Sequence, residues 1–106
     1  MYKDYSIVTF KLKDETDITD KLTAKSYVRF RINNSIYGSN QEVQSSTKDL
    51  TIISLDFKSA PMNFKENQVI YVQPETLGHM LKLRILSVVS SDRKNSVLLN
   101  INKRFG

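Results

Sequence analysis

The sequence predicts an all-β fold, a small antiparallel β-barrel or sandwich of about six strands with a long polar loop and at most one short helical turn. Three observations lead to this prediction. Apolar and polar residues alternate with a period of two along most of the chain, as in strands that bury one face. Short polar segments separate these runs at the spacing of turns. No segment has the long helical period of a crossover helix, so the strands should be antiparallel.

The first predicted strand covers residues 6–13. Its alternation places Val8, Phe10 and Leu12 on one face. The polar residues 14–17 that follow suit a hairpin connection.

The clearest alternation runs over residues 22–32. One face of this predicted strand holds Leu22, Ala24, Ser26, Val28, Phe30 and Ile32. The opposite face holds Thr23, Lys25, Tyr27, Arg29 and Arg31. Residues 50–58 read as the next strand, and its inward side chains are expected to be Ile53, Leu55 and Phe57.

The second half of the chain is predicted to hold three further strands, residues 68–73, 80–90 and 96–103. Pro74 ends the first of them because proline cannot donate to a ladder, and residues 75–79 make a tight connection. The polar residues 91–95 form the turn of a hairpin between the last two strands. Residues 61–67 break the alternation, and we expect one short helical turn there at most.

Residues 38–49 form the longest polar stretch, and Val43 is their single apolar side chain. Such a segment cannot help to bury a core, so we predict a mobile loop that becomes ordered on assembly. The length of 106 residues suits one domain, residues 1–106, without a boundary or an internal repeat.

The composition argues against catalysis. Cysteine is absent, the three glycines are scattered, and His79 is the single histidine. These counts exclude a catalytic thiolate and a phosphate-binding glycine loop. No motif places an orienting acid beside His79, so a general base is not indicated either. We therefore expect a protein that is not an enzyme and that has no cofactor and no metal site. We also expect no membrane contact, because no apolar run approaches the length of a membrane span.

Two charged clusters are candidate sites. The acids Asp14, Glu15, Asp17 and Asp20 could attract calcium, but their spacing lacks the central glycine and the distal glutamate of a calcium loop. We interpret them as a solvated hairpin tip. The face of Lys25, Tyr27, Arg29 and Arg31 interleaves cations with an aromatic side chain, under a net charge of +5. This pattern fits a solvent-exposed strand face, a single-stranded nucleic-acid surface or a protein interface.

The order of elements carries a family resemblance. Residues 66–70, "ENQVI", match a "gd-x-I" type segment, and residues 83–88, "LRILSV", match a "y-x-I-x-x-V" type strand before a polar turn and a closing apolar strand. In these features the chain resembles the head–tail joining proteins of tailed phages, also called head-closure, stopper or neck connector proteins. It differs from the usual pattern at Asn67, where the family has Asp, and in having no tryptophan.

The resemblance implies a structural virion protein of the phage neck, assembled in the host cytoplasm. Members are small β-barrels that form a homo-oligomeric ring, with twelve-fold symmetry, below the portal. The ring joins the head to the tail and helps to close the DNA exit channel. The implied partners are further copies of the chain, a portal or adaptor protein, and a tail terminator or tail tube protein. DNA in the channel is a further possible partner.

The alternative reading is an oligonucleotide-binding type of β-barrel that holds single-stranded nucleic acid through its basic face. The connector reading places contacts on the polar loops and on the basic strand face, and the nucleic-acid reading uses Tyr27 and the basic face. The candidate interface residues are Lys25, Tyr27, Arg29, Arg31, Asn40, Gln41, Glu42, Gln44, Lys48, Arg93 and Lys94.

Overall fold

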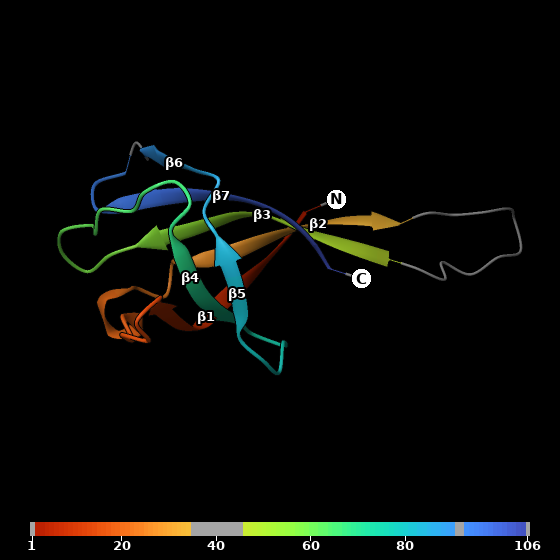
Figure 1. Ribbon diagram of the computed structural model, residues 1–106, viewed down its shortest axis with the longest axis horizontal. Helices are drawn as coiled ribbons and strands as arrows, with labels where there is room; N and C mark the ends of the chain where they lie inside the picture. The colour runs from red at the N-terminus through yellow and green to blue at the C-terminus, as the bar shows by residue number, and fades with distance from the viewer. Residues whose placement is uncertain (1, 35–45, 91–92, 106) are drawn as a thin grey trace, which may run out of the picture.

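The computed structural model describes residues 2–34, 46–90 and 93–105, and its strands form one curled antiparallel sheet (Figure 1). The strands in chain order are β1 Tyr2–Leu12, β2 Tyr27–Asn34, β3 Ser46–Asp56, β4 Val69–Pro74, β5 Leu81–Arg84, β6 Ser87–Ser90 and β7 Ser96–Phe105. A single turn of 3-10 helix in the described residues, η1, covers Thr19–Lys21. The all-β prediction is confirmed, with seven strands in the described part of the chain.

The sheet has the strand order β5-β4-β1-β2-β3-β7-β6 and curls into a half-barrel. Strand β1 belongs to both halves of the curl, since its first residues pair with β2 and its last residues pair with β4. The pairing changes at a β-bulge between Ile7 and Thr9. A bulge bends its strand and increases the local twist, which lets β1 turn from one half to the other.

The same bulge corrects the predicted faces of β1. Phe10 is fully buried and Leu12 packs against the core, but Val8 is 51% exposed. Ile7 packs against the core in its place. The extra residue of the bulge shifts the alternation by one position, so the expectation that Val8 shares the face of Phe10 was wrong.

The predicted strand over residues 22–32 begins only at Tyr27. The N–H of Lys25 donates to Thr23 Oγ1 (3.2 Å) and the N–H of Ser26 to the Thr23 carbonyl (3.1 Å), so these residues form a turn. Threonine and serine favour such turns through bonds of their side chains to nearby main-chain groups. Lys25 therefore lies outside the strand whose face it was expected to share.

The predicted strand over residues 80–90 is two strands. Ile85 and Leu86 separate β5, which pairs with β4, from β6, which pairs with β7. The predicted hairpin at the end of the chain is confirmed for β6 and β7, where Ser87 faces Asn100 and Ser90 faces Val97. Residues 61–67 contain no helix, and the one 3-10 turn lies at η1 instead.

The predicted polar loop is shorter than expected. Its last residues, 46–49, belong to β3 and pair with residues 31–34 of β2. Residues 32–34 of β2 and 46–47 of β3, which lie beyond the last pairs with β1 and β7, project as a two-stranded ribbon (Figure 1). The remainder of the predicted mobile loop, residues 38–45, lies outside the described residues.

The core fills the concave side of the sheet. Ile53, Leu55 and Phe57 are at most 3% exposed, as the alternation in β3 predicted. Phe64, from the segment between β3 and β4, packs edge to face on Phe10 with ring centroids 6.2 Å apart. Edge-to-face pairs add to the gain from burial, so this segment helps to close the open side of the curl.

The bulge gives a direct test. Phe10→Ala should lower the free energy of unfolding by about 3–5 kcal/mol, because it empties a buried aromatic site. Val8→Ala, two positions away, should lower it by less than about 0.5 kcal/mol, because Val8 faces solvent. Urea denaturation followed by circular dichroism measures both. A loss from Val8→Ala of 2 kcal/mol or more, as for a buried methyl-bearing side chain, would contradict the bulge.

Candidate functional site

The outer face of β1 and β2 carries a compact cluster around Arg29. Its guanidinium binds Asp4 through two hydrogen bonds, Nε to Oδ1 at 2.8 Å and Nη2 to Oδ2 at 3.2 Å. The guanidinium carbon lies 5.2 Å from the ring centroid of Tyr27 and 6.0 Å from that of Tyr2. The hydrogen bond to Asp4 is the main cause that raises the pKa of Arg29 above its ordinary value.

This geometry changes what the predicted basic face can do. Tyr27, Arg29 and Arg31 do share β2, and Arg31 is exposed. The charge of Arg29, however, is matched by Asp4 on the neighbouring strand. The cluster is therefore an aromatic surface with an internal ion pair, and it presents less net positive charge than the sequence indicated.

A second cluster surrounds Asp56 at the end of β3. Thr23 Oγ1 donates to Asp56 Oδ2 (2.6 Å), and Ser96 Oγ donates to Asp56 Oδ1 (2.7 Å). Ser26 Oγ accepts from the Asp56 N–H (2.9 Å) and donates to the Asp56 carbonyl (3.2 Å). The side chains of Asp56, Thr23, Ser26 and Ser96 thus tie the turn before β2 to the end of β3 and the start of β7.

The hydrogen bonds from Thr23 and Ser96 lower the pKa of Asp56, and the nearby charges of Lys25 and Arg93 lower it further. The structure thus brings two predicted interface residues, Lys25 and Arg93, to the same carboxylate. Lys94 is exposed beside Arg93. The polar contacts of Asp56 with Thr23 and Ser96 account for the cluster as a structural junction.

Other predicted interface residues lie outside the description. Asn40, Gln41, Glu42 and Gln44 are not among the described residues, and of Lys48 only the main chain, paired with residue 32, is described.

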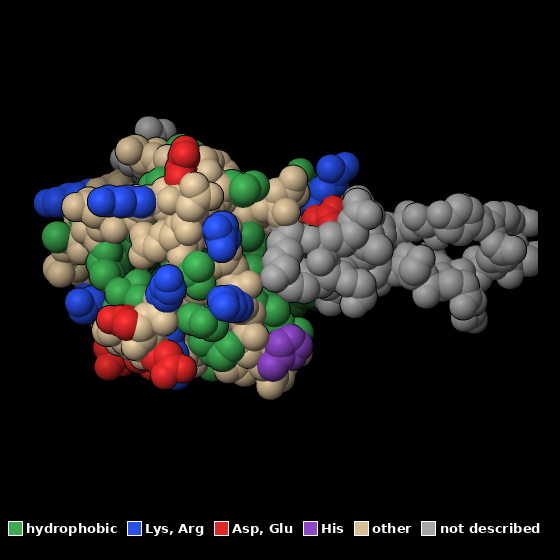
Figure 2. Space-filling view, viewed as in Figure 1, with side chains coloured by type: hydrophobic (Ala, Val, Ile, Leu, Met, Phe, Trp, Pro, Cys, Tyr) green, Lys and Arg blue, Asp and Glu red, His purple; other side chains and the backbone are tan. Residues whose placement is uncertain are grey.

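The acidic turn behaves as a capped turn. Asp17 Oδ1 accepts from the Thr19 N–H (2.9 Å) and from Thr19 Oγ1 (2.6 Å), and Asp14 Oδ1 accepts from the Thr16 N–H (3.1 Å). These bonds lower the pKa values of both carboxyl groups. Figure 2 shows the acidic side chains gathered at the lower left, over this turn and η1. Among the described residues, no group of three or more His, Cys, Asp or Glu side chains could hold a metal ion.

His79 lies exposed in the connection between β4 and β5, away from the clusters around Arg29 and Asp56. In the part of the chain that the structure describes, no helix is long and apolar enough to span a membrane.

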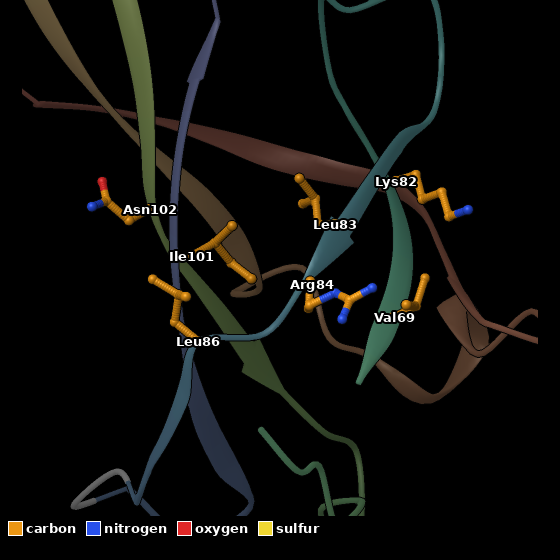
Figure 3. A pocket seen from close by; sticks show the side chains of 7 residues that line it. All are labelled: Val69, Lys82, Leu83, Arg84, Leu86, Ile101 and Asn102. Carbon is orange, nitrogen blue, oxygen red and sulfur yellow. The ribbon is translucent and has the colours of Figure 1, made fainter. Parts of the chain in front are cut away.

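A pocket of about 370 Å³, which sequence reasoning missed, opens between β5 and β7 (Figure 3). It is lined by Val69, Lys82, Leu83, Arg84, Leu86, Ile101 and Asn102. The alternation in β5 indicates which of its side chains face inward, since Leu83 is buried while Lys82 and Arg84 are exposed. Its position depends on the division of residues 80–90 into two strands, which the alternation does not reveal.

Comparisons of the chain with protein-family models, with curated proteins and with solved structures found no match.

The Asp56 junction predicts a pH dependence of stability. Because the pKa of Asp56 is lowered on folding, its ionised form contributes stability that is complete above its ordinary value of 3.8. That stability is lost as the pH falls through the folded-state pKa. Asp56→Asn should lower the free energy of unfolding at pH 7 by about 1–3 kcal/mol, the cost of removing hydrogen bonds to a charged group. It should also flatten the decline between pH 5 and pH 2.

Urea denaturation across that pH range measures both effects. Asp20→Asn is the matched control, because it removes an exposed carboxylate of η1 that makes no side-chain hydrogen bond with the described residues. An Asp56→Asn curve parallel to that of the unmodified protein would contradict the role of the junction. Asp14 and Asp17 supply a remaining slope in either variant, since their pKa values are also lowered.

Proposed function

We propose that the chain is a structural connector of a tailed-phage neck, which forms a homo-oligomeric ring between the portal or adaptor and the tail. The observation that carries this proposal is an exposed apolar edge. Leu86, Val88 and Val89 are 55%, 36% and 42% exposed, and they lie in and directly before β6, the last strand of the sheet.

An edge strand of this kind needs a partner. Soluble proteins protect their edge strands with charges, proline, bulges or covering segments. Strand β6 has the sequence Ser-Val-Val-Ser, which contains no charge and no proline. Contiguous exposed apolar side chains mark interaction surfaces, so this edge fits contact with another copy in a ring or with the next ring of the neck.

The residues behind the family resemblance support the same proposal. Asn67, where the family has Asp, has a φ of 68° in the turn before β4. Asn and Asp tolerate this left-handed conformation better than other residues with side chains, so the exchange preserves the local backbone.

The alternative, a barrel that binds single-stranded nucleic acid, has one observation in its favour. Tyr2 is 60% exposed and lies beside Arg29 and Tyr27, so its ring is accessible to a base. The pairing of Arg29 with Asp4 weakens this reading, because backbone phosphates would have to compete with an internal carboxylate.

The connector proposal predicts the effect of Val89→Asp. A carboxylate on β6 should leave the melting temperature nearly unchanged, because Val89 is exposed, but it should abolish ring assembly and the joining of heads to tails. Native mass spectrometry of the chain, alone and with a phage portal protein, and electron microscopy of the particles provide the readouts. Filled heads and separate tails are the expected particles.

Thr76→Asp is the matched control for this experiment. It adds the same charge in the turn after β4, at a position with a φ of 68° that Asp accepts, far from β6 in Figure 1. It should assemble normally. Normal head–tail joining by Val89→Asp protein would overturn the proposal for this edge.

The two readings also differ in an oligonucleotide titration. The connector should bind a single-stranded oligonucleotide weakly, and Tyr2→Ala should leave that affinity within about twofold. Tight binding that falls steeply with salt and is lost by about tenfold or more in Tyr2→Ala would favour the nucleic-acid reading instead. Fluorescence anisotropy at several salt concentrations measures both quantities.

A further inference from the structure

The pocket between β5 and β7 lies beside an open sheet edge. Strand β5 is the first strand in the sheet order and pairs with β4 alone among the described strands. The N–H of Ile85 donates to the Gln68 carbonyl (3.0 Å), and the N–H of Asn67 donates to the Ile85 carbonyl (2.7 Å). Main-chain groups of successive residues point to alternate sides of a strand. Those of Arg84 therefore point away from β4, toward the open edge.

The two faces of this edge differ in chemistry. In Figure 3 the side chains of Leu83 and Ile101 point into the space between β5 and β7, whereas Lys82 and Arg84 extend to the other side of β5. Leu83 and Ile101 are 2% exposed and form the floor, and Leu86 is an exposed apolar wall. None of the seven described residues that line the pocket is acidic.

Among the described residues, Arg84 has no ion-pair partner, and its side chain is exposed. Figure 2 shows Lys and Arg side chains interspersed with hydrophobic ones over the face formed by β4 and β5. A strand placed along β5 would thus meet an apolar surface with alternate side chains and a basic surface with the others.

We propose that the open edge of β5 binds an extended segment of a partner protein in which apolar and acidic residues alternate, adding it to the sheet as a further strand. The apolar side chains of the segment enter the pocket against Leu83, Ile101 and Leu86. Its carboxylates lie beside Arg84 and Lys82 across the strand pair. Main-chain hydrogen bonds supply affinity and the alternation supplies selectivity, as in other cases of strand addition.

This site shares Leu86 with the exposed apolar edge, but Val88 and Val89 do not line it, and it does not depend on the connector function. Val89→Asp protein, which should fail to assemble, should bind such a segment as well as the unmodified protein does. Failure of one proposal is therefore distinguishable from failure of the other.

The test uses a short peptide in which valine alternates with glutamate. N-methylation along one of its edges prevents self-association and leaves the other edge free to pair. The unmodified protein should bind this peptide at least about tenfold more tightly than a peptide with lysine in place of glutamate. A peptide N-methylated along both edges should not bind. Isothermal titration calorimetry measures the affinities, and amide shifts in NMR spectra locate the site at β5 and β7.

The variants test the two faces separately. Arg84→Glu should weaken binding of the acidic peptide by at least about tenfold and strengthen binding of the lysine peptide. Leu86→Ser should weaken both peptides, because it removes the apolar wall. Lys94→Glu is the matched control for charge, since it makes the same change in the turn between β6 and β7, and it should have little effect. Thermal melts establish that each variant is folded.

Several results would overturn the proposal. Equal affinity of the unmodified protein for the acidic and the lysine peptides would exclude the charge complementarity. Binding of the doubly N-methylated peptide would exclude strand addition. Displacement of the acidic peptide by a single-stranded oligonucleotide that binds more tightly would assign the basic face to nucleic acid instead.

Discussion

The crossing of the chain at Ile85 and Leu86 holds the curled sheet together. Successive residues of a strand direct their main-chain groups to opposite sides. The main chain of Ile85 forms hydrogen bonds with Asn67 and Gln68, directly before β4 near one end of the sheet. The N–H of Leu86 donates to the Asn100 carbonyl of β7 (2.9 Å), near the other end. Ile85 is fully buried. Because the two ends meet at this crossing, the sheet stays curled around its core, and the pocket lies beside the crossing.

The sequence predicted the fold class and several strand faces well, because alternation reports burial on one side of a strand. Ile53 and Leu55 were placed correctly since β3 runs without interruption over them, and Phe57, directly after β3, continues the same face. The errors occur where the main chain changes direction and the alternation continues. The bulge after Ile7, the turn before Tyr27 and the crossing at Ile85 all leave the residue pattern intact. Only the pairing of distant strands distinguishes these positions, and a single sequence does not contain that pairing.

For the candidate surfaces, too, the sequence predicted what lies along one strand but not what depends on the pairing of strands. Tyr27 and Arg29 were found because they share one strand, but the partner that neutralises Arg29 is Asp4, from a strand whose pairing could not be inferred. The junction at Asp56 is formed by side chains from three separate segments, so no local sequence motif predicts it. The net charge of each surface therefore depends on which charged side chains pair between strands. A count of basic residues along β2 therefore overestimates the positive charge of its face.

The sharing of β1 between both halves of the sheet also constrains how the chain folds. Residues of β1 pair with β2 near in sequence and with β4 far along the chain, Lys11 facing Tyr71. Residues 2–6 of β1 pair with β2 and residues 7–12 pair with β4, so one continuous strand joins the two halves, and they should fold and unfold as one cooperative unit. Such non-local pairings require the closure of large loops, and the entropy cost of closure comes before any gain from the contacts. We therefore expect the protein to fold slowly for its size. During synthesis β1 leaves the ribosome before β4 does, so residues 7–12 of β1 must wait for their partner strand.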